Sequence, residues 1–164
     1  MKLHALLILV GLTLSGCSTL STNFAPNANL GRFKRVFVQQ SLNDNHGLDV
    51  LIVKELQARG IQAESGPLTL MPRDVKAYLT YQDRWDWDFK NYLIALTVSV
   101  RDANSDSLLA SASYFRPTAF MKTPDFMVQT VLDGLFNPSA KSRSAAPPAK
   151  PADESSSARG RRRD

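Results

Sequence analysis

Three carboxylates and both tryptophans of the chain lie within nine residues, in the segment YQDRWDWDF at 81–89. Two carboxylates that flank a glycosidic bond can divide the acid and base roles of its hydrolysis. One hypothesis is therefore a hydrolase that acts on the cell wall and uses Asp83 with Asp86 or Asp88. A second is that Asp83, Trp85 and Trp87 belong to a binding surface.

The alternation of residue types in this segment favours packing over catalysis. From position 75 the odd positions are mostly apolar and the even positions mostly polar, as in a strand with one buried face. Asp86 and Asp88 then share the solvent face with Arg84 and Lys90, and the tryptophans lie on the core face. Asp83 breaks the pattern. It is a desolvated functional carboxylate, or its side chain turns out at a bulge or pairs with an arginine.

The remaining sequence offers little for other chemistries. The sequence has two histidines, His4 in the N-terminal stretch and His46 in the loop DNHGLD at 44–49. A metal site needs three or four converging ligands, so we expect this loop to cap the next helix instead. No glycine-rich phosphate loop and no Gly-x-Ser-x-Gly motif occurs in the sequence. We therefore expect no catalytic residue, no metal and no cofactor.

The residue periods predict the elements that position these side chains. Strands are expected over 33–39 and 61–64, and a helix over 48–59 that ends at Gly60. A second helix should begin with Thr123 as N-cap and Pro124 in its first turn.

A hairpin is expected over 75–100, because the apolar parity switches from odd to even across a turn at 88–91. This register places Trp87 opposite Tyr92 and Trp85 opposite Ile94. A further strand over 107–115 would place Val100 opposite residue 108. Together the elements predict an α+β fold: a small mixed, largely antiparallel sheet of about four to five strands, with two helices on one face.

The formal net charge of +5 is not spread over the chain. From position 24 to 137 the lysines and arginines equal the aspartates and glutamates in number; one positive charge of the excess is Lys2, and the rest lies after position 138. Arg161, Arg162 and Arg163 close this tail. They could bind lipid phosphates or peptidoglycan carboxylates, or simply be solvated. A basic tail on a neutral domain gives no reason to expect a nucleic-acid partner.

The N-terminus has the parts of an export signal. Lys2 is followed by the apolar stretch 5–14, and small Ser15 and Gly16 precede Cys17, the single cysteine. About ten apolar residues are too few for a bilayer core, which takes about 20.

Leu14-Ser15-Gly16-Cys17 resembles the lipobox of bacterial lipoproteins. The resemblance implies that residues 1–16 are a cleaved signal peptide, that Cys17 carries acyl chains such as palmitate, and that these chains anchor the protein in a membrane. Ser18, the residue after the cysteine, implies the periplasmic face of the outer membrane. We then expect a flexible linker over 17–30, one periplasmic domain over 31–137 and a disordered basic tail over 138–164.

The expected order of elements resembles the domains of small envelope-assembly lipoproteins, such as the lipopolysaccharide-assembly lipoprotein and the activators of penicillin-binding proteins. This resemblance implies a non-enzymatic module that binds or scaffolds an envelope protein or a glycan. The hydrolase hypothesis above and an auxiliary subunit of an envelope transporter are the alternatives. The sequence does not identify the partner or the oligomeric state.

Overall fold

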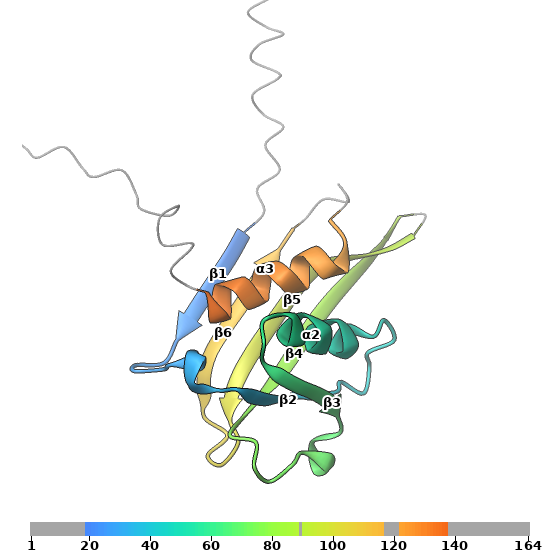
Figure 1. Cartoon of the computed structure of the whole chain (residues 1–164). Coiled ribbons are helices and arrows are strands. Elements are labelled where there is room, and N and C mark those ends of the chain that lie inside the picture. Colours follow the sequence, from blue (N-terminus) through green and yellow to red (C-terminus); the bar gives the residue numbers. More distant parts are fainter. Residues whose placement is uncertain (1–18, 89, 117–121, 138–164) are drawn as a thin grey trace, which may run out of the picture.

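The computed structural model describes residues 19–88, 90–116 and 122–137, which form one six-stranded sheet and two α-helices (Figure 1). The elements in chain order are β1 (Thr19–Phe24), η1 (Leu30–Arg32), β2 (Arg35–Gln39), α2 (Leu48–Ala58), β3 (Gln62–Gly66), η2 (Leu68–Leu70), β4 (Ala77–Asp88), β5 (Lys90–Asp102), β6 (Leu108–Phe115) and α3 (Pro124–Phe136).

The strands are arranged in the order β1-β6-β5-β4-β2-β3. The first four are antiparallel neighbours, whereas β2 pairs in parallel with both β4 and β3. This confirms the predicted α+β fold with a mixed, largely antiparallel sheet, although the sheet is larger than predicted.

Both helices lie on the same face of the sheet and contact each other, as Figure 1 shows. Their apolar sides and the facing strand residues form one core cluster. Gly60 ends α2 with a φ of 75°, and the Thr123 hydroxyl accepts a hydrogen bond from the backbone of Phe126, so the predicted helix ends are confirmed. Among the described residues, no helix has the length and hydropathy to cross a membrane.

The extra strand is β1, which lies in the segment predicted to be a flexible linker. That prediction is wrong for Thr19–Phe24, whose six residues are all in register with β6. The sequence TLSTNF shows no apolar alternation, because five of its six side chains are exposed and only Leu20 packs on the core. Pairing with the backbone of β6 therefore orders a segment that its side chains do not mark as a strand.

The predicted hairpin register is correct in one half and wrong in the other. Leu79 lies opposite Val100 and Asp83 opposite Leu96, as expected. A register shift between Arg84 and Trp85 then places Trp85 opposite Leu93 instead of Ile94. The bulge adds one residue to β5, which shortens the turn at the tip.

The predicted register of β5 with β6 is wrong by two residues. Val100 lies opposite Ala110, because the turn is one residue wider than expected and a register shift between Val100 and Arg101 adds a second residue. Asp106 adopts a φ of 57° there and donates its backbone N–H to the carbonyl of Asp102 at 2.9 Å. The shift is even, so the small side chains of Ala110 and Ala112 still face the helices.

Candidate functional site

Asp83 and Trp85 are bound to each other on the helix side of β4. The indole Nε1 of Trp85 donates a 2.7 Å hydrogen bond to Oδ2 of Asp83. The Asp83 side chain is half-buried, and a bulge follows one residue later. Among the described residues no ion pair joins Asp83 to an arginine, so its partner differs from the one considered above.

His46 lies against the same tryptophan. Its imidazole stacks on the Trp85 ring with centroids 3.8 Å apart and 15° between the planes. The structure thus brings together a histidine, an indole and a carboxylate that are up to 39 positions apart in the sequence. Nothing in the residue periods indicates this contact, because it depends on how the loop before α2 crosses the sheet.

A hydrogen-bond network beside this cluster was not predicted. The hydroxyl of Tyr81 donates to Oδ2 of Asp44 at 2.7 Å, and Asp44 also accepts the backbone N–H groups of His46 and Asp49. Asp49 is buried and accepts a 2.9 Å hydrogen bond from the hydroxyl of Ser65. The loop at 44–49 therefore does cap α2, as expected, with Asp44 as the side chain that accepts from the first turn.

The pKa values of this network follow from its burial and its bonds. Burial raises the pKa of Tyr81, and the hydrogen bond to the Asp44 carboxylate raises it further. Partial burial acts to raise the pKa of Asp44, but the bonds from Tyr81 and from the backbone outweigh it and leave that pKa lowered. Both groups therefore keep their usual neutral-pH states, with the Asp44 carboxyl ionised and the Tyr81 hydroxyl protonated.

Two carboxylates of the hydrolase hypothesis, those of Asp83 and Asp86, do not lie on the same face of the sheet. Side chains alternate along β4, so Asp86 lies on the opposite face of the sheet from Asp83. The side chain of Asp88 lies outside the described residues. No group of three or more possible metal ligands occurs in the described part of the chain.

Trp87 is not a core residue, although the alternation of residue types along its strand predicted that it would be. Its side chain is 69% exposed. The hairpin of β4 and β5 continues past both helices, so neither α2 nor α3 covers its tip (Figure 1). The tip therefore carries a large aromatic surface in contact with solvent.

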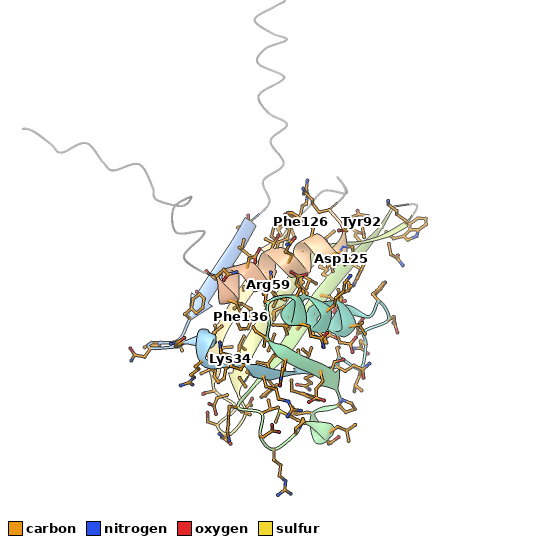
Figure 2. All side chains as sticks on the ribbon, in the orientation of Figure 1. Lys34, Arg59, Tyr92, Asp125, Phe126 and Phe136 are labelled. Atoms are coloured by element: carbon orange, nitrogen blue, oxygen red, sulfur yellow. The ribbon has the colours of Figure 1, made fainter. Side chains whose placement is uncertain are left out.

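A shallow groove of about 320 Å³ lies at the C-terminal ends of the two helices. Lys34, Arg59 and Phe136 line it, and Figure 2 labels all three on one side of the domain. The Arg59 side chain is 13% exposed and ties the helices together, with one guanidinium nitrogen bound to Glu55 and the other 2.7 Å from Asp133. Its Nε is buried and has no partner among the described residues.

The face of the sheet away from the helices is polar and uncharged at its centre. Alternation places two cross-strand rows of four side chains on this face. The rows, each in the order β1, β6, β5, β4, are Ser21, Ser113, Thr97, Gln82 and Asn23, Ser111, Ser99, Thr80. We call these eight residues the open face. None of them is buried, and the hydroxyls of Thr97 and Ser113 lie 2.9 Å apart.

The remaining predicted site residues cannot be compared with the structure. Cys17, the predicted lipidation site, and Arg161, Arg162 and Arg163 of the tail lie outside the described residues.

Comparison with known proteins identifies a fold but no family. No protein-family model and no curated protein matches the chain. Among solved structures, the PelC dodecamer of Paraburkholderia phytofirmans superposes with a TM-score of 0.54 at 15% identity, covering 73% of this chain and 97% of that one. A point variant of the same dodecamer gives 0.53 at 15% identity with the same coverage. A minor lipoprotein of Acinetobacter baumannii reaches only 0.33 at 13% identity, over 68% of this chain and 95% of that one.

Proposed function

We propose that this protein is a lipoprotein held at the periplasmic side of the outer membrane by acyl chains on Cys17, and that its domain is a non-enzymatic binding or scaffolding module of the cell envelope. The observation that carries this proposal is the open face, an uncharged polar surface that neither α2 nor α3 covers. Neighbouring strands of a sheet lie about 4.8 Å apart, so its rows form a regular array.

The chemistry of the open face suits a polar partner. Hydroxyl and amide groups both donate and accept hydrogen bonds, so they match the hydroxyl groups of a glycan or the backbone of a protein. No charged side chain lies in the two rows, so a partner can cover them without burying an unpaired charge. The carboxylates of an enzyme would need to converge, and Asp83 and Asp86 instead lie on opposite faces of the sheet.

The shared fold adds independent support for a scaffold. The PelC protein with the same fold was solved as a dodecamer. A chain of this fold can therefore present many copies of one surface, which raises the avidity of weak polar contacts. Native mass spectrometry of the mature protein would show whether this chain also assembles.

A matched pair of glutamines tests the binding surface. Gln82 lies on the open face, and Gln129 lies on the exposed side of α3; both side chains are exposed. A photo-crosslinking residue at each position, irradiated in intact cells, should give a defined adduct from position 82 and none from position 129. Adducts from position 129 alone would place the partner on the helices and contradict the proposal.

The enzymatic alternative has its own test. Purified protein incubated with peptidoglycan sacculi should release no more soluble fragments than buffer does. Release that disappears in Asp83→Asn, a variant that still accepts the Trp85 hydrogen bond, would favour the hydrolase.

The proposed membrane anchor is tested separately. The mass of the native N-terminus should show acyl chains on Cys17, and fractionation should find wild type with the membranes and Cys17→Ala in the soluble fraction.

A further inference from the structure

The first strand begins almost at the predicted anchor. Thr19 is the first residue of β1 and follows Cys17 by two positions. Consecutive Cα atoms are 3.8 Å apart, so the Cα atoms of these two residues are separated by at most about 8 Å. A lipid on Cys17 would therefore hold this end of β1 against the bilayer, because no linker of useful length remains between them.

The strand register shows which other residues lie at this end. Thr19 lies opposite Phe115 of β6, Phe115 opposite Ala95 of β5, and Ala95 opposite Arg84 of β4. Beyond that row the β4–β5 hairpin continues to its tip. Figure 1 shows the start of β1, the hairpin tip and the start of α3 at one end of the domain, and η2 at the other.

The chemistry of this end fits a lipid interface more than a charged partner. Trp87 at the tip and Phe115 beside Thr19 are both exposed. Tryptophan is enriched where membranes meet water, because its ring is apolar and its N–H can bond to water or headgroups. On the hairpin, basic Arg84 and Lys90 are matched by acidic Asp86 and Asp88, so the formal charges of these four residues offset one another.

We propose that this end of the domain, with the Trp87 side chain in the lipid interface, rests on the bilayer that holds Cys17. The inference deepens the function proposed above and depends on the same anchor. The tether keeps the tip close to the lipid, so a contact too weak to recruit a free protein is enough to orient a bound one. The strands then run away from the membrane, and the open face is turned sideways into the periplasm.

The test couples the anchor chemically and compares two ends of the domain. The mature chain from Cys17 is joined through its single thiol to a maleimide lipid in phosphatidylcholine vesicles that contain brominated acyl chains, which quench tryptophan fluorescence. Trp85→Phe leaves Trp87 as the only tryptophan. The control carries Trp85→Phe, Trp87→Phe and Leu70→Trp, since Leu70 of η2 is 71% exposed and lies at the opposite end.

Quenching should be at least about twofold stronger for Trp87 than for the tryptophan placed at position 70. Equal quenching, stronger quenching at position 70, or none at either position overturns the orientation. If Trp85→Phe does not fold, wild type and Trp87→Phe are compared, and the quenched part of the emission should be lost in the second. Because the lipid is attached chemically, the outcome does not depend on acylation in cells, which the mass of the native protein tests.

Discussion

The hydroxyl of Tyr81 in β4 donates a 2.7 Å hydrogen bond to Oδ2 of Asp44, in the loop before α2. The same hydroxyl accepts the backbone N–H of Ser41 at 3.2 Å. Tyr81 thus binds both ends of the loop segment 41–44. The Asp44 carboxylate also accepts the backbone N–H of Asp49, in the first turn of α2.

This arrangement predicts an acid dependence of stability. The pKa of Asp44 is lowered in the native state, so the unfolded state binds protons more readily. The contribution of Asp44 is therefore present above the unfolded pKa of about 4 and is lost as the pH falls through the lower native pKa. Asp44→Asn should reduce the free energy of unfolding by about 1–3 kcal/mol at neutral pH and flatten its decline below about pH 4.

Urea unfolding at a series of pH values checks this. Some acid dependence should remain in Asp44→Asn, because hydrogen bonds also lower the pKa values of Asp102 and Asp106. Tyr81→Phe should flatten the same part of the curve, whereas Tyr114→Phe, a change in another core tyrosine, should not. Parallel curves for wild type and Asp44→Asn would show that the bonds to Asp44 add no pH-dependent stability.

A second prediction compares two ion pairs that both join α2 to α3. Arg59 and Asp133 lie 2.7 Å apart with the arginine 13% exposed, whereas Lys54 and Asp125 lie 3.9 Å apart and are 74% and 59% exposed. A double-mutant cycle with Arg59→Met and Asp133→Asn should give a coupling energy of about 1–2 kcal/mol. The cycle with Lys54→Met and Asp125→Asn should give less than about 0.5 kcal/mol.

Chemical denaturation of the wild type and of the six variants of the two cycles measures both couplings. Equal coupling energies would mean that burial of the Arg59 guanidinium does not strengthen its ion pair with Asp133.

A third prediction concerns the close contact between β1 and α3. A Cβ atom added at Gly134 of α3 would lie 2.9 Å from Cγ2 of Thr22 and 3.3 Å from Cδ2 of Leu20. Alanine is the better helix former by about 1 kcal/mol, but an overpacked contact costs about 1–3 kcal/mol. Gly134→Ala should therefore destabilise the protein slightly and speed amide hydrogen exchange in β1 more than in β5.

The double variant Gly134→Ala with Thr22→Ser provides the control. It removes the methyl group that the new Cβ would strike, so β1 exchange should return toward the wild-type rate. A single variant Gly134→Ala with unchanged β1 exchange would show that the edge strand does not depend on close approach to α3.

The candidate site was predicted only in part. Alternation indicated that Asp83 breaks the apolar side of its strand, and the structure confirms its place opposite Leu96. The hydrogen bond to Trp85 and the stacking of His46 could not be predicted, because they depend on a bulge and on a loop path that leave no periodic signal. The open face could have been noticed as serines and threonines at alternate positions of 97–99 and 111–113, but its full width required β1.

The sequence by itself determined the α+β class, both helix caps and the core face of each long strand, because these depend on local residue periods and on N-cap and glycine chemistry. Only the tertiary structure decided that Thr19–Phe24 is a strand, that Trp87 lies in solvent and that β6 pairs with β5 two residues away from the predicted register. Those features depend on backbone pairing between distant strands and on where the helices stop covering the sheet. Neither of these can be predicted from the side chains of the segment concerned.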